Sequence, residues 1–245
     1  MKFSIIIPAH NEECFISRCL DSIEKASVPY RSQVETIVVL NRCTDSTEKI
    51  VRDWGAKTLI NEDKNLAKIR NAGAKTATGE ILVTIDADSW MTDNMLVEID
   101  RLLQSGKYIG GGVPILPERM STGILFSIAL LKFYILLSGL AGGLYWCYRR
   151  DFEAIGGFNE NLLVGEDLDF AKRLRAYGRA HGKKFTTMSK ASITTSCRKF
   201  DHFGDWFIFK QMLFNHREIM ECAKGKDATF ANRCFYDFEH PRKQG

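Results

Sequence analysis

The stretch that decides the fold is "LVTIDADSW", residues 82–90. A short run of apolar and β-branched residues leads directly into Asp86 and Asp88. Such a continuous run is typical of a strand that is buried on both faces of a parallel sheet. Residues i and i+2 of an extended chain point to the same side. The two carboxylates are therefore predicted to face one direction where the strand ends.

An Asp-x-Asp pattern is weak evidence without its setting, because the chain contains it twice. The second copy, Asp167 and Asp169, lies in a predicted helix that begins with Glu166 and runs to Gly178. On a helix, residues i and i+2 diverge, so this second pair cannot hold one ion together. The helix dipole favours acids in the first turn, so these acids could be simple capping groups. Alternatively, one of them is a general base beside the ligand cleft.

The segments that precede residue 82 have the same strand-like character. Apolar runs at 3–7 and 35–40, with a shorter one at 58–60, predict three more strands. Helical periodicity follows the strands, and we expect Asn11, the pair Asp45 and Glu48, and Thr92 to cap three of the helices, while residues 66–77 form another. This alternation predicts the α/β class, with a mostly parallel central sheet and helices on both faces.

In open sheets of this class, ligands bind outside the carboxyl ends of the strands. Residues 8–12, 41–45 and 86–88 follow three predicted strands, so we expect them to lie together. Two carboxylates at such a place can hold a hard divalent cation, directly or through water. A turn followed by a helix cap explains Asp86 and Asp88 equally well, and the stretch itself does not decide between these interpretations.

Residues 123–147 are apolar over a length that could span a bilayer. The glycines at 139, 142 and 143 and the charge of Lys132 favour a buried helix at 124–138, a glycine turn and a strand at 144–148. Two short strands are predicted within 184–195. For the aromatic-rich helix predicted at 205–222, which includes Trp206 and Leu213, core packing is favoured over docking on a membrane surface.

The length suits one large α/β domain or two small ones, and the composition is that of a soluble globular protein. The 245 residues are 45% hydrophobic and carry a net charge of +4, which is too small and too dispersed to favour nucleic acid. Seven irregularly spaced cysteines favour a reducing compartment over a zinc site or a disulfide framework. The first apolar run is too short for a signal peptide. We therefore expect a cytoplasmic protein with peripheral contact at the inner face of the membrane, and the oligomeric state stays open.

Four segments occur in a specific order: "IIIPAHNEE", "VVLNRCTDST", "AKIRNAGAKTATGEILVTIDAD" and "GGLYWCYRRDFEAIGGFNENLLVGEDLDFAKRLRAYG". Together they resemble the family-2 inverting glycosyltransferases of GT-A fold over residues 3–200. The resemblance implies one domain at 1–225, with a nucleotide-sugar-binding half at 1–112 and an acceptor-binding half at 113–225. A polar tail would occupy 226–245.

The resemblance also implies a nucleotide-sugar donor, commonly a UDP-sugar, and Mn²⁺ or Mg²⁺. Matched residue by residue, it places Asp86 and Asp88 at the metal and makes Asp167, with Glu166 beside it, the catalytic base. Asn71 and Gly73 would shape the helix. The residues implied to bind the nucleotide sugar are Pro8, Ala9, His10, Glu12, Asn41, Lys68, Arg70, Asp86, Ala87 and Asp88.

Two departures from the family pattern bear on the substrate. Leu40 stands where many relatives carry an aspartate that helps to read the base, which weakens the assignment of uracil. No Gln-x-x-Arg-Trp follows Glu166 and Asp167, which favours transfer of one sugar over polymerisation. The acceptor would be a hydroxyl on a glycan, a lipid or a small molecule. His181 and His202 are candidates for a third metal ligand.

Three other functions are compatible with a parallel sheet. A nucleotidyltransferase would usually have a glycine-rich phosphate loop near the first strand, and "PAHNEE" is not one. A dinucleotide-dependent oxidoreductase would have a G-x-G-x-x-G after that strand, which is absent. An inactive nucleotide-sugar-binding relative would be expected to lose its acids, whereas Asp86, Asp88, Glu166 and Asp167 are all present.

Overall fold

The computed structural model describes residues 2–138 and 143–214. The strands are β1 Phe3–Ala9, β2 Val34–Asn41, β3 Lys57–Asn61, β4 Ile81–Ile85, β5 Ser89–Met91, β6 Tyr108–Gly112, β7 Ile115–Pro117, β8 Leu144–Tyr148, β9 Lys184–Thr187 and β10 Ile193–Thr195. The α-helices are α1 Ile16–Ser27, α2 Thr47–Trp54, α3 Leu66–Thr76, α4 Met95–Gln104, α5 Thr122–Ser138, α6 Arg149–Ala154, α7 Glu166–Ala180, α8 Arg198–Phe203 and α9 Phe207–Phe214, with a 3-10 turn at Arg31–Gln33.

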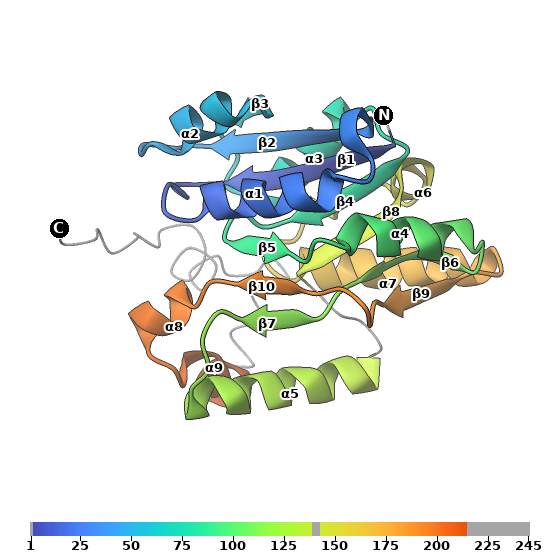
Figure 1. Cartoon of the computed structure of the whole chain (residues 1–245). Helices are drawn as coiled ribbons and strands as arrows, with labels where there is room; N and C mark the ends of the chain where they lie inside the picture. The colour runs from blue at the N-terminus through green and yellow to red at the C-terminus, as the bar shows by residue number, and fades with distance from the viewer. Residues whose placement is uncertain (1, 139–142, 215–245) are drawn as a thin grey trace.

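The larger sheet confirms the predicted α/β architecture. Within the described residues its strand order is β3-β2-β1-β4-β8-β6-β9 (Figure 1). Strands β1 to β4 run parallel, and β8 is antiparallel to both β4 and β6. All five residues of β4 are buried, as a strand covered on both faces requires. The strands predicted at 3–7, 35–40, 58–60 and 144–148 are therefore confirmed.

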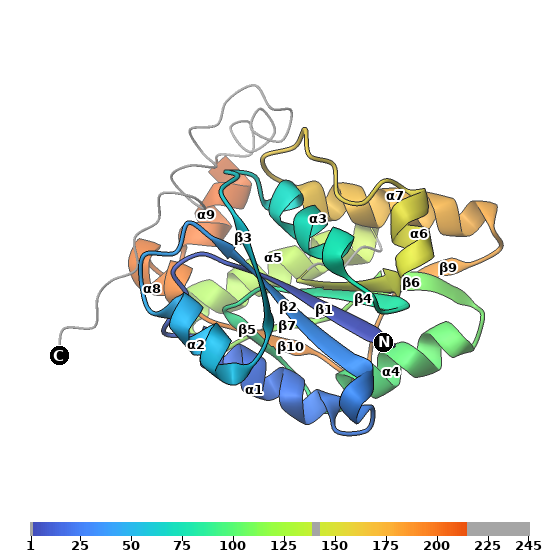
Figure 2. The same ribbon diagram turned by 90° about the horizontal axis from the view of Figure 1, so that it is seen from above.

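Helices cover both faces of this sheet, as predicted. Helices α1, α2 and α4 lie on one side, and α3, α6 and α7 lie on the other (Figure 2). The first side packs Leu20, Ile23 and Ile99 against the sheet, and the second packs Phe158, Phe170 and Leu174. The carboxyl ends of β1, β2 and β4 lie at one edge of the sheet, and this is where the sequence placed a ligand site.

A small second sheet was not predicted in full. It has the order β5-β10-β7 in the described chain, and α5 lies beneath it (Figure 1). Strand β5 follows Asp88 directly and pairs with β10, which lies more than a hundred residues later. Strands β5 and β7 have three residues each, which is too short for a periodic pattern.

None of the three predicted residues occupies an N-cap position, although Asp45 Oδ1 accepts a hydrogen bond from the N–H of Thr47, the first residue of α2, at 3.0 Å. Asn11 is four residues from the N-cap of α1, and its side chain accepts a hydrogen bond from the Thr44 N–H at 2.8 Å. Helix α2 begins after Ser46, and Glu48 pairs with Arg52 rather than closing a capping box with Asp45. Helix α4 begins after Asn94. In each case the polar residue holds the loop before the helix, a role that local sequence does not separate from capping.

Two interpretations of the apolar second half also need correction. Helix α5 forms where expected, but Leu125, Phe126 and Phe133 are about half exposed, so it is not a buried helix. Trp206 is 41% exposed and Leu213 is 50% exposed, so core packing is wrong for these residues too. Across 2–138 and 143–214, no helix has both the length and the apolar content needed to cross a bilayer. The glycine turn at 139–142 and positions 215–222 of the predicted last helix lie outside the described residues.

A buried carboxylate, Glu35, joins the amino ends of the central strands. It accepts hydrogen bonds from Ser4 Oγ at 2.5 Å and from the Thr78 N–H at 2.6 Å, and it pairs with Lys57. Burial opposes its ionisation, but these donors prevail and lower the pKa of Glu35 from about 4.5 to about 2. Its stabilising contribution is therefore complete above about pH 4.5 and is lost as the pH falls toward 2.

We predict that acidification from pH 5 to pH 2 costs the native chain about 2 to 3 kcal/mol more than it costs Glu35→Gln. Urea unfolding followed at several pH values measures this difference. Glu24→Gln, at an exposed position of α1, is the matched control and should keep the native pH slope. Equal slopes for the native chain and Glu35→Gln would contradict the assigned role.

Candidate active site

The loops after β1 and β2 meet at the open edge of the sheet, as predicted. His10 Nδ1 and the Asn41 carbonyl oxygen are 2.6 Å apart and share a hydrogen bond. The Glu12 N–H donates to Thr47 Oγ1 at 2.7 Å. These bonds fix the loop that carries Glu12, so its carboxylate is held in the interior with 6% of the residue exposed.

The carboxylate of Asp88 lies beside Glu12, and Arg198 joins them. Arg198 Nη1 is 2.6 Å from Glu12 Oε2, and Arg198 Nε is 3.1 Å from Asp88 Oδ2. Ser196 Oγ donates to the same Asp88 oxygen at 2.9 Å. Arg198 is the first residue of α8, and β10 ends just before Ser196, so the small sheet delivers both donors to Asp88.

A second arginine joins Asp86 to the start of α7. Arg70 Nη2 donates to Asp86 Oδ1 at 2.7 Å, and Arg70 Nη1 donates to Glu166 Oε1 at 2.8 Å. The guanidinium group of Arg70 also lies over the Phe158 ring, 5.4 Å from its centroid. The Arg70 side chain is 9% exposed. Its two ion pairs join the end of β4 to the first turn of α7.

Asp167 follows Glu166 and is partly exposed, whereas Glu166 is buried against Arg70. Asp167 Oδ1 accepts a hydrogen bond from the Leu168 N–H at 2.7 Å. Burial raises the pKa of Asp167 above its ordinary value, and the positive charge of Arg70 opposes the rise. Burial likewise raises the pKa of Glu166, to about 7, against the effect of Arg70. Asp169 points away from the cluster and pairs with Arg173 at 2.6 Å. Asp167 and Asp169 therefore diverge, as predicted.

The two arginine-linked groups form one charged cluster. Asp86 interacts electrostatically with Glu12 and Arg198 on one side and with Glu166 and Asp167 on the other. Burial and the charges of Asp88 and Asp86 raise the pKa of Glu12 to about 8, although Arg198 opposes the rise. Within the described chain, five carboxyl groups thus lie near two guanidinium groups, and a bound cation would stabilise the charged forms of these acids.

The cluster fits a divalent cation by its chemistry. Asp86 Oδ2 and Asp88 Oδ1 accept no hydrogen bond from the described residues, and both carboxylates sit at the same sheet edge. Two carboxylate oxygens are a suitable partial ligand set for Mg²⁺ or Mn²⁺, which commonly complete their shells with substrate phosphates and water. His181 packs on Tyr177 at the other end of α7. The described residues contain no cluster of three metal-binding side chains, so neither His181 nor His202 completes a ligand set with Asp86 and Asp88.

The other residues implied by the resemblance lie around this edge in different settings. The Asn41 amide donates to the Asn61 and Asp63 carbonyl oxygens at 2.7 and 2.9 Å, so it fixes the loop before α3. Ala9 and Ala87 are each 2% exposed and pack in the core. Pro8 is half-buried at the end of β1, and Lys68 is exposed beside Asp63.

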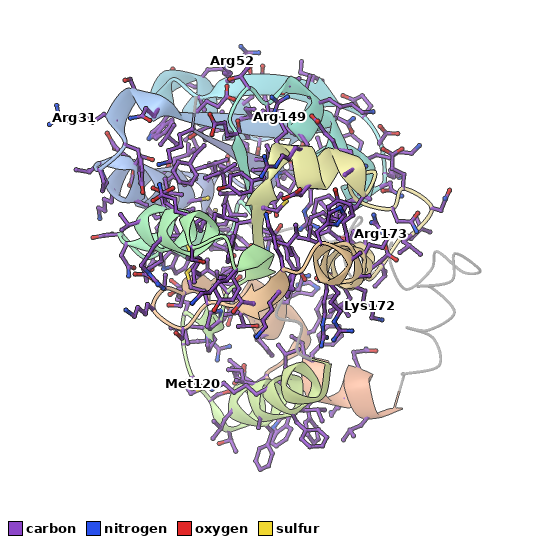
Figure 3. The ribbon with its side chains drawn as sticks, turned by 90° about the vertical axis from the view of Figure 1, so that its right-hand side faces the viewer. Arg31, Arg52, Met120, Arg149, Lys172 and Arg173 are labelled. Carbon is purple, nitrogen blue, oxygen red and sulfur yellow. The ribbon has the colours of Figure 1, made fainter. Side chains whose placement is uncertain are left out.

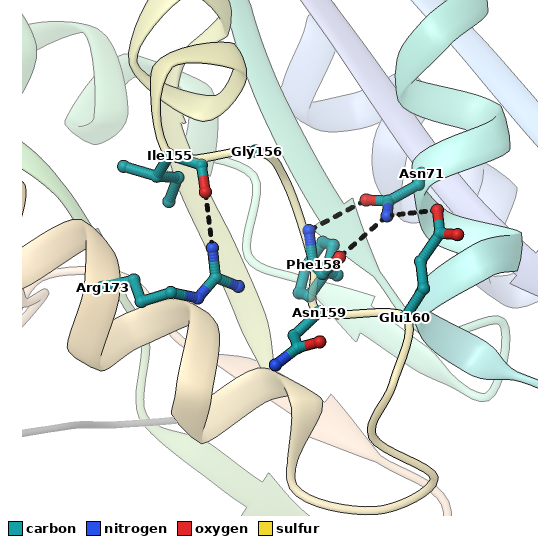
Figure 4. Close-up of a pocket in the computed structure, with 7 residues that line it drawn as sticks. All are labelled: Asn71, Ile155, Gly156, Phe158, Asn159, Glu160 and Arg173. Carbon is teal, nitrogen blue, oxygen red and sulfur yellow. Dashed lines mark hydrogen bonds between the residues drawn. The ribbon is translucent and has the colours of Figure 1, made fainter.

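Helix α3 is shaped by Asn71 and Gly73. The Asn71 side chain donates to the Phe158 carbonyl oxygen and accepts from the Phe158 N–H, both at 2.9 Å. Figure 4 shows these bonds at a cavity of about 330 Å³ lined by the 155–160 loop. A Cβ on Gly73 would lie 2.6 Å from Ile6 Cγ2, so glycine allows α3 to approach β1. Both contacts position Arg70 and the loop before α7.

Three functional candidates were missed by the sequence analysis. Arg198 and Ser196 contact Asp88 across more than a hundred residues of sequence, and no local motif marks them. The Tyr145 hydroxyl is buried without a hydrogen bond in the described residues. Burial and the nearby Asp167 raise the pKa of Tyr145, which places its hydroxyl in the charged cluster. Tyr145 lies on β8 opposite Thr84 of β4, and this position could be inferred only from strand pairing.

Comparison with known proteins identifies the family. The model described as glycosyl transferase family 2 matches residues 4–119, and a model described as the N-terminal domain of galactosyltransferase matches 123–196. Residues 4–119 of this chain therefore belong to glycosyltransferase family 2. Poly(ribitol-phosphate) beta-N-acetylglucosaminyltransferase TarS of Staphylococcus aureus is 32% identical over 102 residues, which cover 39% of this chain and 18% of that protein. Glycosyltransferase AglE of Haloferax volcanii is 27% identical over 69% of this chain and 60% of that protein.

Solved structures show that the fold is GT-A. Residues 1–349 of S. aureus TarS in complex with UDP-GlcNAc align with a TM-score of 0.66 and 19% identity, covering 95% of this chain and 75% of that one. The mannosyltransferase PcManGT from Pyrobaculum calidifontis, in complex with GDP-Man and Mn²⁺, aligns with a TM-score of 0.62 and 23% identity, covering 79% and 56%. These structures confirm the predicted fold, and the family 2 resemblance is confirmed by the family model over residues 4–119.

Proposed function

We propose that this family 2 glycosyltransferase moves one sugar from a nucleotide-sugar donor to an acceptor hydroxyl with inversion at the anomeric carbon. The observation that carries the proposal is the Arg70 bridge. It holds Asp86, at the carboxyl end of β4, and Glu166, at the start of α7, on one guanidinium group. The donor side and the base side of a transfer reaction are thus fixed to one another.

Asp167 is proposed to be the general base. The acceptor oxygen attacks the anomeric carbon, the bond from that carbon to the donor phosphate breaks, and Asp167 takes the hydroxyl proton. Among the described residues, Asp167 is partly exposed and forms no ion pair with Arg70, whereas Glu166 is engaged by Arg70. Glu166 therefore suits a positioning role, and inversion needs no second carboxylate as a nucleophile.

The proposed donor is a UDP-sugar, in line with the UDP-GlcNAc and UDP complexes of TarS. His10, Glu12, Asn41, Lys68 and Arg70, with the backbone at Pro8, Ala9 and Ala87, are proposed to line its site. Mn²⁺ or Mg²⁺ would be held by Asp88 and Asp86, and it would offset the charge of the leaving diphosphate. The structures of PcManGT and GalNAc-T7 each contain Mn²⁺, which agrees with this choice.

The acceptor is proposed to be a hydroxyl on a glycan, a lipid or a small molecule, bound by the 113–225 half of a domain that spans 1–225. One relative from Methanococcus voltae, 24% identical over 68% of this chain, is a glucuronosyltransferase whose name specifies a dolichyl phosphate-linked acceptor. We propose a cytoplasmic location with peripheral contact at the inner face of the membrane.

Thermal-shift measurements with nucleotides and nucleotide sugars test the donor assignment, since ligand binding raises apparent stability by mass action. We expect UDP or a UDP-sugar with Mn²⁺ to raise the melting temperature, and each alone to raise it less. The corresponding GDP compounds provide the matched comparison. A rise with GDP in place of UDP would reject uracil, and no rise with any nucleotide and Mn²⁺ would reject the proposed site.

A further inference from the structure

Helix α5 presents an apolar stripe away from the protein. The outward positions are Leu125, Phe126, Ala129, Lys132 and Phe133, which recur with the helical period. On the opposite side the first turns of the helix are buried, with Ile124 at 0% and Ser127 at 3% exposure, whereas Leu131 further along is 36% exposed. A surface helix normally directs polar residues outward. Here the outward stripe is apolar except for one lysine, and side chains project from α5 away from the body of the molecule (Figure 3).

Helix α9 extends this stripe into a wider surface. Phe126 stacks on Trp206 with ring centroids 5.6 Å apart, and Phe209 contacts both rings edge-on. Leu213 lies on the exposed side of α9. We call this surface the α5–α9 face; its residues are Leu125, Phe126, Ala129, Lys132, Phe133, Trp206, Lys210 and Leu213. Contiguous exposed apolar surface of this kind marks an interaction site.

The charges on the α5–α9 face select among partners. Its charged residues are Lys132 and Lys210, both exposed, and neither α5 nor α9 contains an aspartate or glutamate. The nearby acids Asp201 and Asp205 are engaged by Arg119 at 2.5 and 2.7 Å. An apolar, aromatic-rich face with lysines and without acids matches a bilayer interface containing anionic lipid. If a second copy of the chain bound through the same face, the lysines of the two copies would repel each other, which disfavours a dimer.

The face is connected to the charged cluster through Arg119 and helix α8. Arg119, just before α5, binds Asp201 of α8 and Asp205. Helix α8 begins with Arg198, which contacts Asp88 and Glu12. A Cβ on Gly123 would lie 2.7 Å from the Asp205 backbone, so α5 is packed closely against the chain that links α8 and α9. A surface that binds at α5 therefore lies one short helix from the cluster.

We propose that the α5–α9 face docks on an anionic phospholipid surface. This inference rests on the peripheral membrane contact that is part of the proposed function. It assigns to that contact a protein surface and a class of lipid. It does not depend on which sugar is transferred, or on transfer at all. Docking would place acceptors that are carried by the bilayer beside the site.

Vesicle co-sedimentation tests the docking. We expect the full chain to bind vesicles of phosphatidylcholine with phosphatidylglycerol, and to bind phosphatidylcholine alone more weakly. Leu125→Asp with Phe133→Asp should abolish binding, because two charges would enter the apolar interface. Ile60→Asp, at an equally exposed apolar position on β3, is the matched control and should bind like the native chain. The thermal shift with UDP and Mn²⁺, measured on the same samples, should be equal in all variants and so reports donor binding separately.

Charge reversal gives a second test that leaves the apolar side chains in place. Lys132→Glu with Lys210→Glu should weaken binding to the anionic vesicles by at least about fivefold and leave binding to phosphatidylcholine unchanged. The proposal is overturned if the native chain leaves both vesicle types unbound, or if the double aspartate variant binds normally. It is also overturned if the native chain forms a dimer that this variant dissociates, because the occupant would then be a second copy.

Discussion

Asp167→Asn is expected to lower turnover by about 10²- to 10⁴-fold, the usual contribution of a positioned general base. The amide keeps the size of the side chain and cannot take the acceptor proton. Donor affinity should remain at the native value, because Asp86, Asp88 and Arg70 stay in place. Steady-state rates with a responsive acceptor and calorimetric titration of the nucleotide measure the two effects separately.

The matched control is Asp169→Asn, two residues later on the same helix. It removes an acid that pairs with Arg173 and does not belong to the cluster, so turnover should stay within a few-fold of native. If Asp167→Asn kept its rate and Glu166→Gln lost it, Glu166 would be the base. Loss of donor affinity in Asp167→Asn would instead indicate that the residue supports the binding site.

Asp88→Ala is expected to remove metal-dependent donor binding. The substitution deletes one of two carboxylates proposed to hold the cation, and changes even at supporting residues of a metal site cost about 10- to 100-fold in affinity. We therefore expect at least about a 100-fold loss for UDP with Mn²⁺ in calorimetry, and little change for UDP alone. Arg198 would keep its contact with Glu12, so the fold should persist.

Asp93→Ala is the control for this experiment. Asp93 is an exposed aspartate five residues later, outside the charged cluster, and its loss should leave the Mn²⁺-dependent affinity unchanged. If Asp88→Ala kept the native affinity for UDP in the presence of Mn²⁺, the proposal that Asp88 holds the cation would be contradicted. The pair of variants therefore separates a site-specific effect from a general reduction of negative charge.

The sheet could be predicted because its information is local. Buried parallel strands require continuous apolar runs, and β1, β2 and β4 display them in sequence. The same rule places Asp86 and Asp88 at the carboxyl edge. The helix caps could not be predicted, since Asn11 and Thr92 have side chains that bond equally well to a loop or to a helix end.

The apolar second half shows the limit of composition. An apolar run is buried only if another part of the protein covers it. The sequence of α5 is the same whether its outward side contacts protein, lipid or water, so the sequence alone does not predict its burial. Exposure of Phe126 and Phe133 became visible only when the neighbouring elements were in place.

By itself, the sequence determined the α/β class, the family resemblance and the acids proposed to carry the chemistry, because periodicity and motifs are encoded over short spans. Only the tertiary structure decided which charges compensate those acids. Arg70 and Arg198 reach Asp86 and Asp88 through the packing of α3 on the large sheet and of β10 on β5. Such pairing depends on contacts between distant segments, and those contacts exist only after the chain has folded.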